Sequence, residues 1–583
     1  MTEFFEVHER DGAARLGELR LAESLPTPAL ADNVLRDAGS LWEAEHEHPE
    51  GSEEHVTMLP HRGFPPGTDP EVEAAFAVDY PETEFASGAV VSPGTARDHG
   101  ADVYALSTAQ GVVGHASAFV ETILELKEAT PADTALYLSG VATPANAALL
   151  AYAGIDLVDA VRAAVRGTEG RYLSTDGAQF LSDLEELPCP CPACARPISE
   201  FTREHCAEHN ANALRAELAR VRARIREGTL RNYVEGQVRH STWQTAAFRT
   251  LDTQWGYLEE RTPIYRRSGL LATTEDALHR VEIQRFADRV TARYRSRFDA
   301  PLVLVPCSAT KPYSDSQSHG QFHDAIRYRG HVVSMTSPIG VVPQELECTY
   351  PAQHYDSAVT GRWSEEEIGF VAEVLERYLT RNEYPRVIAH VPEEGYREIV
   401  ERATGALGID PEFTVEDHPT TDESLTSLSV ALSGEPQYRK RERQHNTVKA
   451  LADVQFGEGA GETLFPDIVT ESRYPKLRAH DRDGDQLAAM VPQYGTLSLT
   501  LAGARRWVES EVAVKRVAID GFVPRGTVLA PGVLDADPEI RVGDEVVVEG
   551  PRAFAIGRAE MFGREMAEST RGVAVDVRHV EER

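Results

Sequence analysis

The sequence contains few lysines and few cysteines, and it lacks any long apolar segment. Only six of its 59 basic residues are lysine, and 93 acidic residues bring the formal net charge to −34 and the pI near 5.0. No stretch approaches the roughly 20 apolar residues that span a bilayer. The N-terminus also lacks the basic segment and apolar core of a signal peptide. We therefore expect a cytoplasmic protein with no membrane association.

The acidic balance and the preference for arginine over lysine are typical of a halophilic protein, whose acidic hydrated surface keeps it dispersed in a high-salt cytoplasm. Moderate acidity also occurs in proteins from low-salt cells. Most of such a surface repels phosphate, so nucleic-acid binding would need local basic islands or screening salt. One basic island is present, and it consists of Arg439, Lys440, Arg441 and Arg443. These side chains either contact phosphate or pair with nearby acidic residues.

Six cysteines in 583 residues are too few for a secreted disulfide scaffold. Four of them lie close together. They are Cys189, Cys191, Cys194 and Cys206. Clustered thiols followed by histidines suit tetrahedral zinc, and a closed site of four protein ligands would be structural. On spacing alone, His205, Cys206 and His209 all compete for the fourth position.

A cysteine outside this cluster, Cys307, follows a strand pattern directly. Four apolar residues, Leu302–Val305, predict a buried strand that Pro306 ends, and Cys307 follows in a loop that contains Lys311. In open α/β sheets, ligands bind at this end of the strands. A chain with so few lysines that places one four residues from a cysteine favours a functional pair. The alternative is a structural thiol beside an ordinary surface lysine.

Alternating strand and helix patterns predict a multidomain α/β chain. Up to residue 130 the pattern is weak, with strand candidates only at 89–91 and 103–106 before a helix at 116–128. A strand from 135, a helix at 145–153 and strands at 155–161 and 171–175 then predict a partial (β/α) TIM-like barrel. A helix with one apolar stripe follows the cysteines at 212–226.

The same alternation continues beyond Cys307. Strands at 331–335 and 387–390, with helices at 320–327 and 365–380, predict a central α/β sheet. Residues 337–343 are expected to form a second loop at a strand end, and 409–437 an acidic linker. The chain ends in short strands typical of a small β-barrel, predicted at 512–519, 526–529, 543–549, 553–558 and 573–580.

These patterns predict four domains. We expect a degenerate barrel with a zinc subdomain at 1–284 and an α/β domain at 285–427. A small α+β domain at 428–505 then leads to a β-barrel at 506–583.

Two stretches resemble families that act on RNA. The C-terminal part, through Val528–Gly532 and Arg571–Ala574, resembles a PUA domain, which implies binding of structured RNA by residues such as Arg571. Residues 136–235 resemble tRNA-guanine transglycosylases. This second resemblance implies Asp159 at the position of the nucleophile. It also implies zinc held by Cys189, Cys191, Cys194 and His209. The Asp-Ser-Gly-Gly-Phe-Gln motif of that family is absent before Leu136.

The stretch Pro306–His319 resembles the signature of archaeosine synthases. This resemblance implies action on 7-cyano-7-deazaguanine (preQ0) at position 15 in the D-loop of archaeal tRNA, where the nitrile becomes an amidine. The amine donor would be lysine or another amine, and a radical-SAM partner protein would complete archaeosine. A homodimer is one expected assembly.

The motif suggests a chemical role for each of its polar residues. We expect the Cys307 thiolate to attack the nitrile and form a thioimidate that the amine displaces. Lys311 and His319 would supply the activating cation, and Tyr313 and Ser316 would bind the base or the amine. Two alternatives stay open: a transglycosylase that uses Asp159, and a non-catalytic tRNA-binding subunit.

Overall fold

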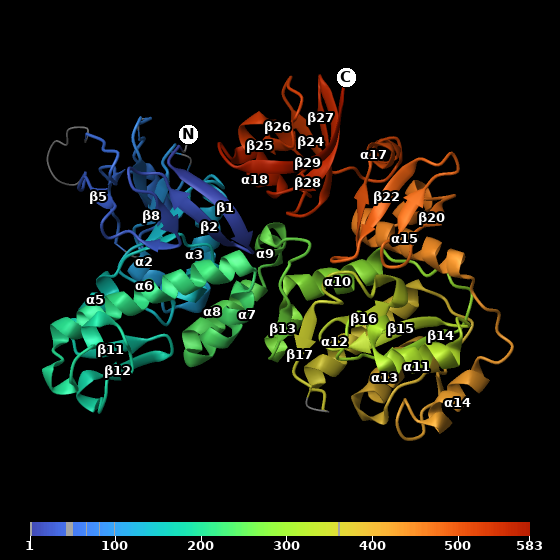
Figure 1. Ribbon diagram of the computed structural model, residues 1–583. Coiled ribbons are helices and arrows are strands. Elements are labelled where there is room, and N and C mark those ends of the chain that lie inside the picture. Colours follow the sequence, from blue (N-terminus) through green and yellow to red (C-terminus); the bar gives the residue numbers. More distant parts are fainter. Residues whose placement is uncertain (1–2, 42–49, 66, 81, 98, 360–361) are drawn as a thin grey trace. The chain divides into compact units, whose positions relative to one another are not determined.

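The computed structural model describes residues 3–41, 50–65, 67–80, 82–97, 99–359 and 362–583, which form two compact units (Figure 1). Unit 1 contains the chain to Pro263 with Thr527–Val542 and Glu560–Asp576, and unit 2 contains Ile264–Gly526, Gly543–Ala559 and Val577–Arg583. Within the described part of the chain, no helix has the length and apolar character to cross a bilayer.

A seven-stranded parallel sheet forms the centre of unit 1. Its order is β4 (Ala29–Leu30), β10 (Leu157–Val158), β9 (Ala135–Leu138), β8 (Val103–Leu106), β7 (Ser87–Val91), β6 (Val56–Met58) and β5 (Leu35–Asp37). The predicted strands at 89–91 and 103–106 are therefore confirmed. The weakly patterned N-terminal region supplies five of the seven strands. These strands have two to five residues each, too few to show a clear period in the sequence.

The segment after this sheet differs from the prediction. Residues 171–175 were expected to extend the parallel sheet, but β11 (Arg171–Ser174) instead pairs antiparallel with β12 (Gly177–Phe180). Gly177 has a φ of +145°, which glycine adopts without strain and which allows the tight turn. The hairpin packs beside α6 (Arg203–Glu227), a helix that a capping box at Thr202 starts and Gly228 ends.

Unit 2 contains a five-stranded sheet covered by helices on both faces (Figure 1). The order is β16 (Gly340–Pro343), β15 (His331–Thr336), β14 (Leu302–Pro306), β18 (Val387–Ala389) and β19 (Glu412–Phe413), parallel except for β16. Val303 and Val305 pack with α11 (Gln317–Ile326) and α14 (Asp422–Ala431). Leu302 and Leu304 face the other side, where α10 (Val281–Ala292), α12 (Glu365–Arg381) and α13 (Glu398–Leu407) lie.

Four predicted elements of this region are confirmed: strands β15 and β18 and helices α11 and α12. Two further predictions for this region are wrong. The expected loop at 337–343 contains β16, which forms a hairpin with β15. The expected linker at 409–437 contains β19 and α14, whose Leu428 and the following Leu432 are fully buried. The apolar residues of α14 stand among serines and threonines, which favour caps and turns, so the helical stripe is hard to see in the sequence.

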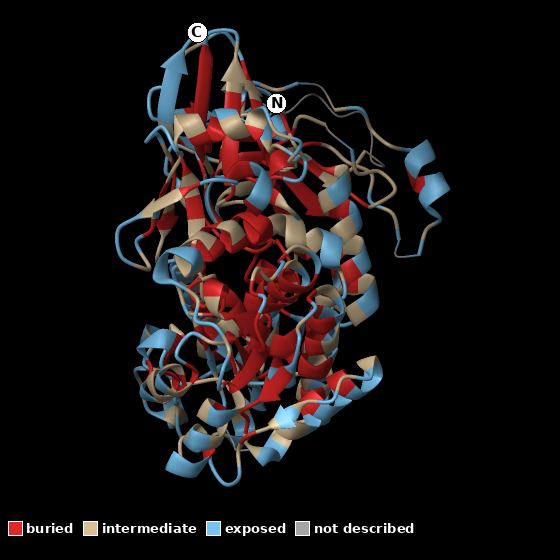
Figure 2. Cartoon of the chain, turned by 90° about the vertical axis from the view of Figure 1, so that its right-hand side faces the viewer, coloured by how far each residue is buried: buried red, intermediate tan, exposed pale blue. Residues whose placement is uncertain are grey.

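The rest of the chain carries α15 (Lys440–Phe456), the antiparallel strands β20 (Val469–Glu471), β21 (Arg478–His480), β22 (Gln486–Val491) and β23 (Thr496–Leu499), and α17 (Leu501–Val508). Five C-terminal strands lie where they were expected: β24 (Arg516–Ile519), β25 (Thr527–Leu529), β27 (Glu545–Gly550), β28 (Ala553–Ala559) and β29 (Val573–Glu582). One more, β26 (Val533–Ala536), was not expected. Figure 2 shows buried residues concentrated on strands and on the inner faces of helices.

Candidate active site and metal centre

Cys307 lies at the carboxyl end of β14, where Pro306 closes the strand. Its side chain is half-buried, and its Sγ lies 3.3 Å from the hydroxyl of Tyr396. Tyr396 comes from the segment between β18 and α13, and Trp363 packs edge-on against its ring. Burial, and then the nearby thiol, raise the pKa of Tyr396, so its hydroxyl stays protonated and can donate to a thiolate. A thiol at this position can act as a nucleophile.

Lys311 lies in the same loop, with its Nζ 3.9 Å from the centroid of the Tyr355 ring. Burial lowers the pKa of Lys311, while the nearby Cys307 and Asp356 act in the opposite direction. A lysine with a lowered pKa exchanges protons near neutral pH more readily than an exposed one. Lys311 therefore combines a local positive charge with the ability to move a proton.

The other three residues of the motif follow Lys311 along the chain, up to the first turn of α11, and are buried. Tyr313 is buried, and its hydroxyl lies 2.7 Å from that of Tyr355. The Ser316 hydroxyl accepts from the backbone N–H of His319 and caps α11. His319 Nε2 donates a hydrogen bond to the carbonyl oxygen of Pro306 at 3.0 Å.

Burial lowers the pKa of His319 to about 4, so this imidazole is neutral at pH 7. It also stacks on the Tyr313 ring at 5.1 Å between centroids. The motif suggested His319 as a possible cation, but a neutral imidazole bonded to the backbone supplies no charge. Lys311 is the cation that the structure brings near Cys307.

Three residues of this site carry no local sequence signal: Tyr355, Tyr396 and Glu347. Glu347 is buried and accepts hydrogen bonds from the Ser314 backbone N–H and the Tyr474 hydroxyl, each at 2.8 Å. It thus ties the motif loop to a segment far along the chain. Neither periodicity nor spacing relates these residues to Cys307, and only the fold brings them together.

Asp159 occupies the equivalent strand end in unit 1, after β10, and its carboxylate accepts three hydrogen bonds. Oδ2 accepts from the Tyr137 hydroxyl and the Gly140 backbone N–H, both at 2.8 Å, and Oδ1 accepts from the Val161 N–H at 3.0 Å. The residue is 4% exposed. A cavity of about 510 Å³ lies nearby, lined by Gly140, Arg162 and Gln244 among others, and Asp159 is not part of its lining.

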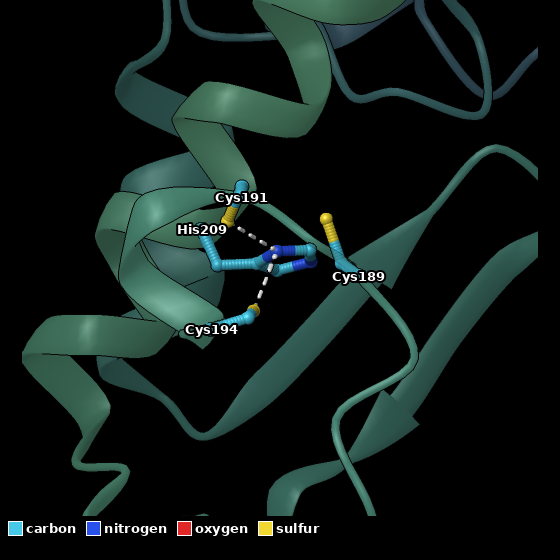
Figure 3. A group of neighbouring side chains, drawn as sticks. All are labelled: Cys189, Cys191, Cys194 and His209. Carbon is cyan, nitrogen blue, oxygen red and sulfur yellow. Dashed lines mark hydrogen bonds between the residues drawn. The ribbon is translucent and has the colours of Figure 1, made fainter. Parts of the chain in front are cut away.

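The predicted metal ligands converge in unit 1 (Figure 3). The ligand atoms of Cys189, Cys191, Cys194 and His209 all lie within 4.8 Å of one another. His209 Nδ1 is 3.3 Å from the Cys194 Sγ and 3.6 Å from the Cys191 Sγ. Three thiolates and one imidazole are a donor set that suits a tetrahedral metal ion. The cluster can therefore bind a metal.

The surroundings of His209 orient its ring toward the sulfurs. Its Nε2 donates to the carbonyl oxygen of Leu173 at 2.9 Å, which leaves Nδ1 as the free acceptor. The Tyr172 ring stacks on the imidazole at 3.8 Å. The two rival ligands lie outside the cluster: His205 closes the capping box of α6, and the Cys206 thiol points to the Arg171 carbonyl oxygen.

The predicted RNA-binding residues lie in two places. Arg439, Lys440 and Arg441 are exposed at the start of α15, and Arg443 lies one turn further, with its guanidinium 3.6 Å from the centroid of the Tyr328 ring. Arg571 belongs to unit 1, where it lines a cavity of about 580 Å³ with His8, Arg10 and Arg20.

Four family profiles match the chain in succession. Residues 92–242 match queuine tRNA-ribosyltransferase, and 283–432 match a domain of unknown function. Residues 446–512 match the patch-forming domain C2 of tRNA-guanine transglycosylase, and 510–580 match the PUA domain. The transglycosylase-type and PUA resemblances are thereby confirmed.

The names of similar proteins agree with these family matches. An archaeosine synthase from Haloferax volcanii is 64% identical over 100% of both chains. An archaeosine synthase subunit alpha from Methanosarcina acetivorans is 44% identical, again over 100% of both. A tRNA-guanine(15) transglycosylase from Methanothermobacter thermautotrophicus is 28% identical over 79% of this chain and 68% of its own.

Proposed function

The chain belongs to the archaeosine synthase family of tRNA-modifying transferases, and we propose that it adds lysine to the nitrile of preQ0 at position 15 of tRNA, using Cys307 as nucleophile. The observation that carries this proposal is the half-buried Cys307 at the strand end, beside Lys311 and Tyr396. It is the cysteine of the chain that combines a strand-end position, a nearby cation and partial exposure.

The reaction we propose has two additions and one elimination. The thiolate sulfur forms a bond to the nitrile carbon, and the nitrogen takes a proton, which gives a thioimidate. The lysine amine then adds to the same carbon, and the carbon–sulfur bond breaks to release the thiolate. The net change is addition of one whole amine across the nitrile, with no other product.

Lys311 and Tyr396 assist different steps of this sequence. Lys311 takes the thiol proton and returns it to the developing imidate nitrogen, a role that its lowered pKa supports. Tyr396 donates to the sulfur when it is anionic, during attack and on release. Tyr313, Ser316 and His319 fix the loop through their hydrogen bonds.

The remaining parts serve substrate binding and stability in this proposal. We infer that the seven-stranded sheet is an incomplete TIM-like barrel, and that the Cys₃His cluster holds structural zinc. Arg571 and the basic residues of α15 contact tRNA in the cytoplasm. The name of the Methanosarcina relative, a subunit alpha, supports a partner protein, which we take to be the radical-SAM enzyme.

Mass spectrometry of preQ0-containing tRNA tests the proposal. The tRNA is incubated with the chain and lysine, without any partner protein, and its nucleosides are analysed. A gain of one intact lysine on the preQ0 nucleoside is expected. Unchanged preQ0 at high enzyme concentration would contradict the proposal. Incorporation of free labelled preQ0 base into tRNA would instead support a transglycosylase that uses Asp159.

A further inference from the structure

Two segments of unit 2, distant in sequence, form a basic surface. The end of α11 and the loop that follows it meet the start of α15, where the Tyr438 backbone N–H donates to the Tyr328 carbonyl oxygen at 3.0 Å. We call this surface the Tyr328 patch. It consists of Arg327, Tyr328, Arg329, Arg439, Lys440, Arg441 and Arg443.

The cations of the patch have no acidic partner among the described residues, and six of them lie together. Among the described residues, none of the six basic side chains lies within salt-bridge distance of a carboxylate, and the Nε atoms of Arg329 and Arg443 are buried without any hydrogen bond. Elsewhere in unit 2, Arg386 contacts Glu412 and Glu435, and Arg402 contacts Glu365 and Glu398. With 93 acidic residues available, a concentration of unpaired cations points to an anionic ligand.

The start of α15 adds to this positive potential. Arg439 is its N-cap residue, and Lys440 and Arg441 precede Glu442, the one acid of the first turn. No side chain caps the free backbone N–H groups. Cations at a helix N-terminus oppose the helix dipole, so this arrangement costs stability in the unliganded protein. A phosphate placed there would satisfy the N–H groups and the side chains together.

The backbone at Tyr328 supplies an independent observation. Arg327 and Tyr328 have φ angles of +50° and +58°, a left-handed conformation that non-glycine residues seldom adopt in succession. This strained turn holds the Tyr328 ring outward, where the residue is 44% exposed, with the Arg443 guanidinium 3.6 Å from the ring centroid. Strained residues of this kind are often found at binding sites.

We propose that the Tyr328 patch binds a single-stranded segment of the tRNA substrate, with one unpaired base stacked on Tyr328 and the flanking phosphates on Arg439, Lys440 and Arg441. Every base has a flat π-face that stacks on an aromatic ring, and arginine strengthens such platforms. Helix α11 leads from the Cys307 loop to the patch over roughly 15 Å, a few nucleotides of RNA. The substrate class rests on the proposed function.

Binding of an unmodified tRNA transcript to the full chain tests the proposal, because this transcript contains no nitrile and its binding does not depend on the Cys307 chemistry. Tyr328→Asn removes the ring but tolerates the left-handed backbone, so the fold is retained. We expect it to weaken binding about tenfold, whereas Tyr328→Phe binds as the wild type does. The melting temperature of each variant reports its folding.

The salt dependence of binding tests the phosphate contacts separately. Substituting Arg439, Lys440 and Arg441 together by alanine is expected to reduce the slope of log K against log salt by about 2, and Tyr328→Asn to leave it unchanged. Arg402→Ala, which removes an exposed arginine that has two carboxylate partners, is the matched control and leaves both quantities unchanged. Wild-type affinity and slope in both patch variants would overturn the proposal and favour an acidic protein as the ligand.

Discussion

Asp159 and Cys307 lie at comparable positions, each just beyond the carboxyl end of a strand in a parallel sheet, yet their surroundings differ. The Asp159 carboxylate accepts three hydrogen bonds from its own unit and is almost fully buried. The Cys307 thiol is half-buried and has one described hydrogen-bond partner, the Tyr396 hydroxyl. Asp159 bonds to its own loop, whereas the side chain of Cys307 is partly exposed.

The two strand ends have the same topology, but their side chains differ in the chemistry that they can perform. A nucleophile needs an open approach and a lone pair that is not already bonded. Tyr137, Gly140 and Val161 donate to three of the roughly four lone pairs of the Asp159 carboxylate. At Cys307 the nearest groups are a proton donor and a cation that can move a proton. We infer that reactive chemistry resides in unit 2 and that the strand end in unit 1 has a structural role.

The largest effect should come from removing the Cys307 thiol. Cys307→Ala is expected to reduce conversion of preQ0 in tRNA more than 1,000-fold, because the covalent route is lost. Affinity for tRNA should stay unchanged, since the thiol contributes little surface. Ser308→Ala, at the next residue, is the matched control and should keep wild-type turnover. Substantial turnover by Cys307→Ala would remove the contrast between the two strand ends.

Lys311→Met should have the next largest effect, about 100-fold on kcat/KM. Burial lowers the pKa of Lys311, so its neutral form is populated at lower pH than in a free lysine. Without it, the thiol proton has no neighbouring lysine amine to accept it and must be taken by solvent base. The acidic limb of the pH–rate profile is therefore expected to move upward. An unchanged limb would show that Lys311 only occupies space beside the Tyr355 ring.

Asp159→Asn addresses the other strand end and should alter stability instead of chemistry. The amide keeps the size of the side chain but exchanges one acceptor for a donor facing a backbone N–H. We expect unfolding in urea to require about 2 kcal/mol less free energy. The turnover of the folded variant should equal that of the wild type. Loss of activity without loss of stability would assign Asp159 a part in the reaction.

Tyr396→Phe should produce the smallest of these changes, a reduction of about tenfold in kcat, because one hydrogen bond to a charged sulfur is lost. KM for tRNA is expected to stay constant. Steady-state kinetics at saturating lysine separate the two parameters. If KM rises and kcat does not fall, Tyr396 acts in binding the base and not on the thiol.

Local sequence patterns predicted part of this architecture. Whether an element could be predicted depended on how clear its apolar pattern is. Strands β14, β15 and β18 are continuous apolar runs and could be identified directly. Helix α14 could not, since its buried Leu428 stands among serines and threonines, nor could the two-residue strand β4. The Cys307–Lys311 pair was visible because it is local. Tyr355, Tyr396 and Glu347 were not visible, because only folding brings them to the loop.

Attack of Cys307 on the nitrile is tested most directly by the mass of the Cys307 peptide after reaction without an amine. The chain is incubated with preQ0-containing tRNA, and the mixture is digested with nuclease and protease. Without lysine the thioimidate cannot be resolved, so the Cys307 peptide should carry the mass of the preQ0 nucleotide. Adding lysine should release it. Lysine addition to tRNA without any such adduct would contradict the central claim that Cys307 attacks the nitrile.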